Sequence, residues 1–140
     1  MSYLLDTCVL SEFARPQPDV RVVEWLQAQD ENELYLSVVV LGKLGRGIAH
    51  LPDGMKRRRL DAWLHTELRT RFRGRIFEVT EAVVLEWGER SGALLRDGQT
   101  ISMADGLIGA TAMVHSLVVA TRNTRDIAIT ATPVFNPWID

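Results

Sequence analysis

The sequence predicts a doubly wound α/β domain in which a parallel sheet lies between two layers of helices. Short apolar runs alternate along the chain with amphipathic stretches, and this alternation is typical of repeated β–α–β units. The chain has 140 residues and 46% hydrophobic side chains, which is enough for one domain with its own core. Because no linker or repeat interrupts the pattern, we expect a single domain over residues 1–140.

Five short apolar runs are the expected strands. Connections of the β–α–β type make the strands parallel, so their carboxyl ends meet at one edge of the sheet. That edge is where such folds place their ligands. In chain order the runs are Tyr3–Leu5, Leu34–Leu36, Arg75–Glu78, Leu117–Ala120 and Pro133–Phe135.

Helical spacing of apolar residues marks three of the expected helices, and their apolar faces should pack against the sheet. Ser37 and Thr80 are expected N-caps. The apolar faces are Leu60, Trp63, Leu64, Leu68 and Phe72 in the first of these helices, Val83, Trp87, Leu94 and Leu95 in the second, and Leu107, Ala110, Thr111 and Val114 in the third.

Cysteine content and the length of the apolar runs indicate the cellular compartment in which the protein is expected. Cys8 is the only cysteine, so no disulfide forms within the chain, and the N-terminus carries no charged-then-apolar export signal. No apolar run approaches the ~20 residues that a membrane-spanning helix needs. We therefore expect a soluble protein of the reducing cytoplasm with no membrane partner.

The balance of charge limits how the chain could bind nucleic acid. A formal net charge of −2 gives no global attraction to polyanions, so any contact with RNA must come from local basic clusters. In the first cluster, Lys56–Arg59, the run Arg57–Arg59 is interpreted as a solvated helix face. The second cluster, Arg69–Arg75, remains open between an ordinary helix surface and a basic patch for RNA or an acidic partner.

Three aspartates lie beside apolar runs that are far apart in the sequence. Asp6 directly follows the first expected strand, Asp105 lies at the start of the helix that follows Ser102, and Asp126 lies in the polar turn after the fourth expected strand. A doubly wound sheet would bring all three to the edge where ligands bind. We therefore predict that Asp6, Asp105 and Asp126 form one cluster.

Each aspartate also has a purely structural explanation. Asp6 can cap a helix that begins near Cys8, Ser102 and Asp105 have the spacing of a capping box, and aspartate is common in turns like that of Asp126. The functional interpretation rests on the three together, because gathered carboxylates repel one another unless a cation neutralises them. Mg²⁺ or Mn²⁺, which prefer oxygen ligands, are the simplest such cations.

Other candidates for chemistry are weaker. Cys8 has no histidine near it in the sequence and is interpreted as a small hydrophobe. His50, His65 and His115 share no ligand spacing, so no zinc site is expected. Glu12 is interpreted as a surface charge.

Two other phosphate-handling classes with this architecture are excluded. An aspartyl-phosphate hydrolase needs a second aspartate two residues after the first, and this chain has Cys8 there. A receiver domain needs an acidic pair next to the end of its first strand, and this chain lacks that pair.

The order and spacing of several motifs carry a resemblance over almost the whole chain. The motifs are Leu4-Leu5-Asp6-Thr7, Leu36-Ser37 with Leu41-Gly42-Lys43-Leu44 and Gly47-Ile48, Met103-Ala104-Asp105-Gly106-Leu107-Ile108 with Ala110-Thr111-Ala112, Thr121-Arg122-Asn123 with Asp126, and Asn136-Pro137-Trp138. By these motifs the chain resembles the PIN-domain ribonuclease toxins of toxin–antitoxin pairs, the VapC/FitB type.

The resemblance implies a PIN-like three-layer sandwich with a five-stranded parallel sheet, and cleavage of RNA by acidic residues that bind Mg²⁺ or Mn²⁺. On the matching positions, Asp6, Asp105 and Asp126 would be the catalytic, metal-binding carboxylates. Thr121 and Asn123 would give polar support to the last of them. Family members pair into homodimers and bind a cognate antitoxin, so the resemblance implies both of these partners besides an RNA substrate.

Lys43 departs from the family pattern, because members carry glutamate between the Gly and Leu of this motif. The change moves the site by two charge units, and two unit charges ~4 Å apart interact by about 4 kcal/mol at an effective dielectric of 20. The ammonium could turn to solvent on its long stem, or it could compete with a metal ion. We predict the second arrangement, in which Lys43 replaces a parent glutamate and its ammonium lies against Asp6 and Asp105 in the place that a cation would otherwise fill.

The expected function is therefore a metal-dependent endoribonuclease toxin that a small antitoxin holds in check, with activity lowered or lost through Lys43. The alternative is a catalytically silent PIN-fold protein that only forms the antitoxin complex. Position 43 discriminates between these two functions.

Overall fold

The structure is a computed structural model that describes all 140 residues. Its centre is a five-stranded sheet in the order β3-β2-β1-β4-β5, and every neighbouring pair is parallel. The expected fold class is confirmed, and so are all five expected strands. The strands are β1 (Tyr3–Leu5), β2 (Leu34–Ser37), β3 (Ile76–Phe77), β4 (Val118–Ala120) and β5 (Val134–Phe135).

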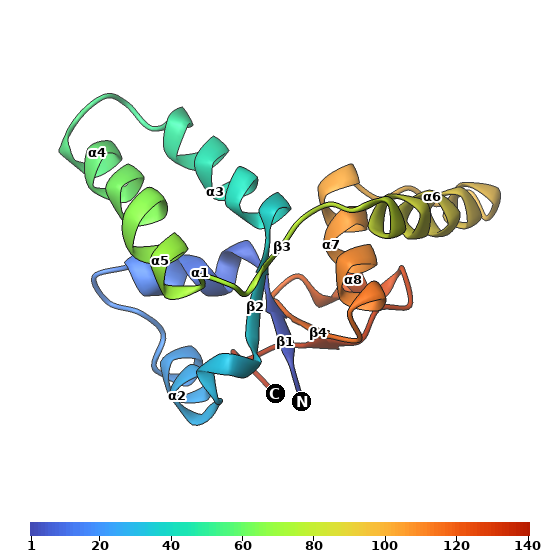
Figure 1. The fold of residues 1–140 in the computed structure, drawn as a ribbon, viewed down its shortest axis with the longest axis horizontal. Helices are drawn as coiled ribbons and strands as arrows, with labels where there is room; N and C mark the ends of the chain where they lie inside the picture. The colour runs from blue at the N-terminus through green and yellow to red at the C-terminus, as the bar shows by residue number, and fades with distance from the viewer.

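Helices lie on both sides of the sheet, with α1 to α5 to the left and α6 to α8 to the right in Figure 1. Ser37 and Thr80 are N-caps as expected, because their side chains accept from the backbone N–H of Val39 and Val83. A π-helical segment, Trp63–Leu68, joins α4 to α5. The helices are α1 (Thr7–Ala14), α2 (Val20–Ala28), α3 (Val38–His50), α4 (Met55–Ala62), α5 (Arg69–Arg71), α6 (Glu81–Arg96), α7 (Met103–Val114) and α8 (Thr124–Ala128).

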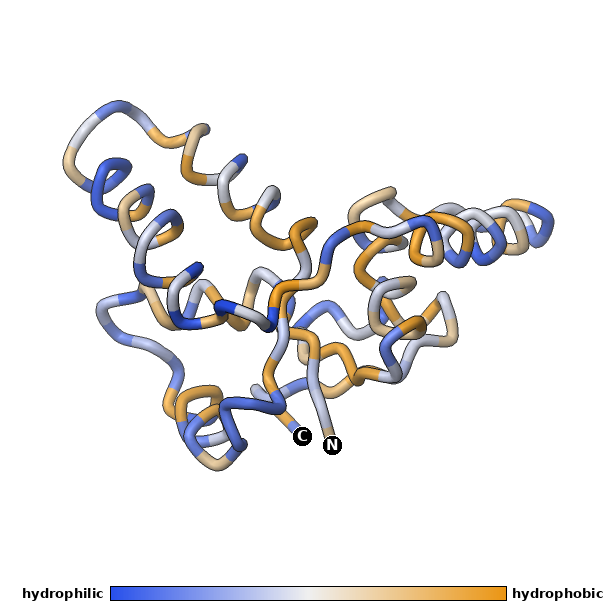
Figure 2. The backbone as a smooth tube through the Cα atoms, in the orientation of Figure 1, coloured by the Kyte–Doolittle hydropathy of each residue, from blue (hydrophilic) through white to orange (hydrophobic).

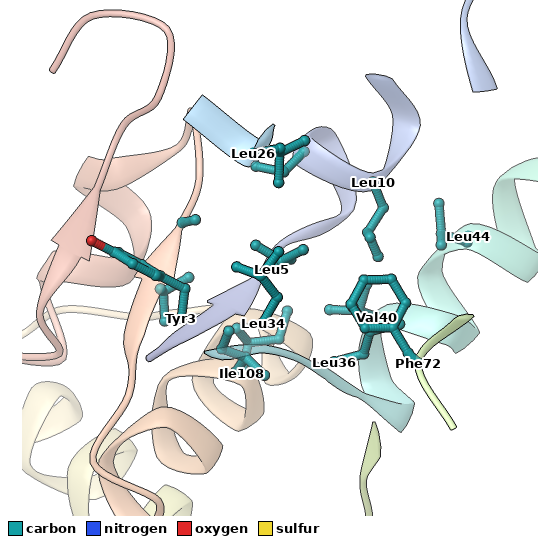
Figure 3. Packing of buried hydrophobic residues seen from close by; sticks show 14 of the residues in the cluster. Tyr3, Leu5, Leu10, Leu26, Leu34, Leu36, Val40, Leu44, Phe72 and Ile108 are labelled. Atoms are coloured by element: carbon teal, nitrogen blue, oxygen red, sulfur yellow. The ribbon is translucent and has the colours of Figure 1, made fainter. Parts of the chain in front are cut away.

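The hydrophobic core joins the sheet to the helices that flank it. Figure 3 shows Leu5 of β1 and Leu36 of β2 close to Leu10 of α1, Val40 of α3 and Phe72, and all five side chains are fully buried. Burial of one such side chain stabilises a fold by about 1.5–3 kcal/mol. This packing fixes the end of β1 and the start of α3, which are the two segments that carry Asp6 and Lys43.

Helix α6 does not face the sheet, contrary to expectation. It packs on α7, where the space above Gly106 is filled by Trp87, whose Cδ1 would lie only 2.7 Å from a Cβ added to that glycine. Val83 and Leu94 are buried there, whereas Leu95 is 63% exposed. The amphipathic pattern therefore predicts the helix correctly, but its apolar face packs on α7 and not on the sheet. Fewer residues of that face are buried than expected, because Leu95 is exposed.

Hydropathy follows this layered arrangement. In Figure 2 hydrophilic turns stand out on α4 and at the far end of α6, whereas the segments that converge at the centre are largely hydrophobic. None of the helices combines the length and the apolar composition that crossing a bilayer requires.

Candidate active site

Asp6 is a buried side chain at the carboxyl end of β1, with 1% of the residue exposed. Its backbone N–H donates to the carbonyl of Ala120 at 3.0 Å, which ties it to the end of β4. Oδ1 accepts from the backbone N–H of Thr7 at 2.7 Å, and Oδ2 accepts from the Thr121 hydroxyl at 2.8 Å. The side chain therefore caps α1, as its structural explanation predicted, and it is also held in one orientation at the sheet edge.

Asp105 lies in the first turn of α7. Its backbone N–H donates to Oγ of Ser102 at 3.1 Å, which confirms one half of the expected capping box. Its carboxylate makes no return bond to the backbone of Ser102 and instead faces Lys43. Capping therefore explains the backbone of Asp105 but leaves its carboxylate free for other contacts.

Lys43 extends from α3 toward both of these carboxylates. Its Nζ lies 3.8 Å from Oδ1 of Asp6 and 3.6 Å from Oδ1 of Asp105. The predicted arrangement is thus confirmed, and the alternative in which this side chain turns outward to solvent is wrong, although a third of the side chain remains exposed. Both distances exceed the direct hydrogen-bond range of about 2.7–3.2 Å, so the contact is electrostatic. One positive charge faces two carboxylates.

Asp126 does not join the other two aspartates. It lies in the first turn of α8 with an exposed side chain, and it makes no hydrogen bond or ion pair. No three His, Cys, Asp or Glu side chains come close enough together to hold a metal ion, so the expected cluster of three is not formed. After β4 the chain turns into the short helix α8, and Asp126 lies on the exposed face of that helix. The spacing of residues in the sequence could not indicate which way this side chain points.

The polar support is also arranged differently from the expectation. The hydroxyl of Thr121 donates to Asp6 rather than to Asp126, and it accepts from the backbone N–H of Asn123 at 3.0 Å. The side chain of Asn123 is exposed and does not cap α8. Thr121 is therefore a positioning residue for the first carboxylate, not the last.

The residues present do not fit a divalent cation held jointly by Asp6 and Asp105. Mg²⁺ needs oxygen ligands around it and commonly uses one or two carboxylates together with water and phosphate oxygens. Here an ammonium already lies within 4 Å of both carboxylates and would repel a second cation. A glutamate at position 43 would instead add a third carboxylate to the same place.

Glu12 is not the surface charge that was expected, because only 3% of it is exposed. Its carboxylate pairs with Arg15 at 3.0 Å and accepts from the backbone N–H of Asp19 at 2.9 Å, and so it joins α1 to the start of α2. Cys8 is half-buried against the core, and its Sγ accepts from the backbone N–H of Arg122 at 3.3 Å. Both side chains are explained by structural contacts.

The arginines of the second basic cluster are used within the fold. Arg71 pairs with Glu31 at 2.7 Å and lies over the ring of Phe13. Arg75 donates to the carbonyl of Leu34 at 2.6 Å. For Arg71 and Arg75 the open question is therefore answered, because both make contacts within the fold. They tie the end of the α4–α5 helical run to Glu31 and to the start of β2.

Comparisons with known proteins agree with the fold. Residues 3–131 match the family model of the PIN domain. Toxin FitB of Neisseria gonorrhoeae is 41% identical over 137 residues, which cover 98% of this chain and 99% of that protein. The crystal structure of FitAcB from the same organism has a TM-score of 0.90 at 40% identity, with 99% of each chain covered.

Two further relatives extend the likeness. VapC ribonuclease Y4jK of Sinorhizobium fredii is 33% identical over 135 residues, which cover 96% of each chain. A toxin–antitoxin complex from Klebsiella pneumoniae has a TM-score of 0.61 at 27% identity, with 97% of this chain and 98% of that chain covered.

Proposed function

Because the chain belongs to the PIN-domain family, we propose that it is the toxin of a toxin–antitoxin pair, with a centre for RNA hydrolysis that Lys43 holds in a weakly active state. The substrate class is taken from the relative that is named a ribonuclease, and the partner from relatives that are named as toxins or as a toxin–antitoxin complex. A homodimer is proposed on the resemblance of the sequence to the family.

The observation that carries this proposal is the position of the Lys43 ammonium between Asp6 and Asp105. Asp6 is held rigidly by Thr7 and Thr121, and Asp105 is carried by a capped helix, so the two carboxylates have fixed places at the sheet edge. The ammonium neutralises part of the negative charge that an activating divalent ion would need there. We propose Mg²⁺ or Mn²⁺ as the cofactor of a form with glutamate at position 43.

A nuclease assay tests the proposal. Purified chain and its Lys43→Glu variant are compared on a labelled RNA in the presence of Mn²⁺, and we expect the variant to cleave at least tenfold faster. Arg46→Glu is the matched control, because it makes the same change of charge on the same helix at an exposed residue that contacts neither carboxylate. It should leave the rate unchanged.

Two results would contradict the proposal in different ways. Equal rates for the native chain and Lys43→Glu would mean that Lys43 does not restrain the centre. Absence of cleavage by both would favour the alternative function, a silent PIN-fold module that only binds its antitoxin.

A further inference from the structure

A groove opens beside the carboxylate pair, between α1, α3 and α4, and we refer to it as the α1–α3–α4 groove. It has a volume of about 660 Å³. Its floor includes Leu44, Ile48 and Leu60 together with the ring of Trp63, which is half-buried. The groove is therefore large enough for an extended ligand and offers it an aromatic surface.

The rim of the α1–α3–α4 groove is positively charged. Four cations line it, Arg15, Lys43, Lys56 and Arg59, and no carboxylate does. Arg15 pairs with Glu12, but Lys56 and Arg59 are exposed and make no ion pair. Because the chain as a whole has a net charge of −2, this concentration of positive charge is a local feature of the groove.

The run Lys56–Arg59 divides between two sides of α4. Lys56 and Arg59 are three residues apart, so helical geometry places them on one face, toward the groove. Arg57 and Arg58 line a different hollow that also contains Asp53 and Asp61, and Arg58 pairs with Asp53 at 3.6 Å. Arg58 and Arg59 are exposed, as expected for a solvated helix face, whereas Arg57 is half-buried.

The α1–α3–α4 groove leads to the carboxylate pair. Lys43 and Thr7 both line it, and each of them contacts the Asp6 carboxylate. A chain-like ligand that lies along α4 would therefore reach the edge where Asp6 and Asp105 are held. A ligand that bound elsewhere on the surface would not be guided to that edge.

We propose that the α1–α3–α4 groove binds a single strand of RNA and delivers it to the carboxylate pair; this inference rests on the proposed function. Lys56 and Arg59 bind backbone phosphates, and Trp63 supplies the surface on which a base stacks. Proteins that bind single strands combine the same two elements, a positive groove and aromatic side chains. An acidic protein helix could also use the charge, but the exposed, unpaired cations beside an aromatic floor favour a polyanion with planar bases.

The test measures binding without cleavage. Fluorescence anisotropy of a labelled 12-nucleotide oligouridine is followed in EDTA for the native chain, the double variant Lys56→Gln/Arg59→Gln, and Trp63→Leu. The control is Arg57→Gln/Arg58→Gln, which removes the same charge from the same helix on its other side. Thermal melts establish that each variant is folded before its affinity is compared.

Loss of two phosphate contacts should lower the slope of log Kd against log salt by about 1.4, since each contact to a single strand contributes about 0.7. At low salt the groove double variant should bind at least tenfold more weakly, and Trp63→Leu about fivefold or more. The control pair should change neither affinity nor slope by a comparable amount.

Equal losses in the groove pair and the control pair would overturn the proposal, because binding would then depend on charge alone. Unchanged RNA affinity in the groove pair, with weakened binding of an acidic helical peptide, would overturn it in favour of a protein ligand. Tight, groove-dependent binding of RNA would support it even if Lys43→Glu failed to cleave, so failure of the proposed function can be distinguished from failure of this inference.

Discussion

The imidazole of His115 is a titratable group that the fold desolvates. Its ring stacks on Phe77 with centroids 3.7 Å apart, and its Nε2 is buried without a hydrogen-bond partner. Burial lowers the pKa of His115 from its usual value of 6.5, because water no longer stabilises the charged form. The stack joins the C-cap of α7 to Phe77 of β3, and the sequence could not indicate it because these residues are far apart in the chain.

Stability should therefore fall at mildly acidic pH. Below pH 6.5 the unfolded chain binds a proton at His115 that the folded chain does not, so unfolding is favoured as the pH falls toward the folded pKa. Above pH 6.5 His115 is mainly neutral in both the folded and the unfolded chain, so it no longer lowers the free energy of unfolding. We expect Tm to fall less between pH 7.5 and pH 5.5 in His115→Phe than in the native chain.

His65→Gln is the control for this comparison, because His65 is exposed on the helical run and faces Asp61 at 3.4 Å. It should keep the native dependence of Tm on pH in this range apart from a small surface effect. Parallel curves for the native chain and His115→Phe would show that another group controls the acid sensitivity.

At the candidate site, residues with fixed local roles could be predicted from the sequence. Asp6 stands where β1 hands over to α1, so its position at the sheet edge follows from the topology. Asp105 lies in the first turn of α7, and its place in that turn follows from the N-cap Ser102 three residues before it. Lys43 could be placed because α3 begins directly after β2 and carries it toward the same edge. Asp126 could not be placed, since the direction of a side chain on a short helix depends on how the preceding turn bends.

At the scale of the elements, α6 and α7 end in the same way with different residues. Gln99 N–H donates to the carbonyl of Leu94 at 2.8 Å beyond α6, and Leu117 N–H donates to Ala112 at 2.8 Å beyond α7. Such an ending requires a residue in the left-handed region. Helix α6 has Gly98 there, with φ of 75°, whereas α7 has Ser116, with φ of 57°.

The two endings therefore predict opposite responses to exchange. A side chain in the left-handed region costs roughly 1 kcal/mol, which glycine avoids. We expect Ser116→Gly to stabilise the chain by roughly this amount and Gly98→Ser to destabilise it similarly, which corresponds to about 2–4 °C in Tm for a domain of this size. Chemical denaturation of both variants checks the signs. A loss of stability in Ser116→Gly would mean that its backbone is held by contacts of the serine side chain.

Strands and helix starts were predictable, whereas the partners of the helices were not. Short apolar runs bounded by capping residues such as Ser37 and Thr80 define the elements locally. The choice of α7 rather than the sheet as the partner of α6 depends on close packing at Gly106. That contact joins residues from different helices, and periodicity within one helix carries no information on it.

At the scale of the whole molecule, the exposed face of α6 suits the proposed homodimer. Leu85 and Leu95 are 65% and 63% exposed, and Gly88 and Gly92 between them have open space beside Cα. The pattern Leu-x-x-Gly-x-x-x-Gly-x-x-Leu reads the same in both directions. An antiparallel pair of helices about a two-fold axis needs this symmetry, because each leucine then meets its counterpart across the close approach of the glycines.

We expect the native chain to sediment as a dimer at micromolar concentration and Leu85→Glu/Leu95→Glu to sediment as a monomer with unchanged helix content. Ile139→Glu places the same charge at another exposed apolar residue and should leave the dimer intact. A native chain that remains monomeric at high micromolar concentration would contradict the homodimer. A dimer that survives the double substitution would place the interface on another face.

The central claim is that the ammonium of Lys43 takes the place of a divalent cation between Asp6 and Asp105, and binding of Mn²⁺ measured by electron paramagnetic resonance tests it without reference to catalysis. The account predicts weak binding by the native chain and binding at least about tenfold tighter by Lys43→Glu, since the charge changes by two units a few ångströms from the ion. Adding Asp105→Asn to Lys43→Glu should abolish the gain, and Arg46→Glu should not produce it. Equal Mn²⁺ affinity of the native chain and Lys43→Glu would contradict the claim.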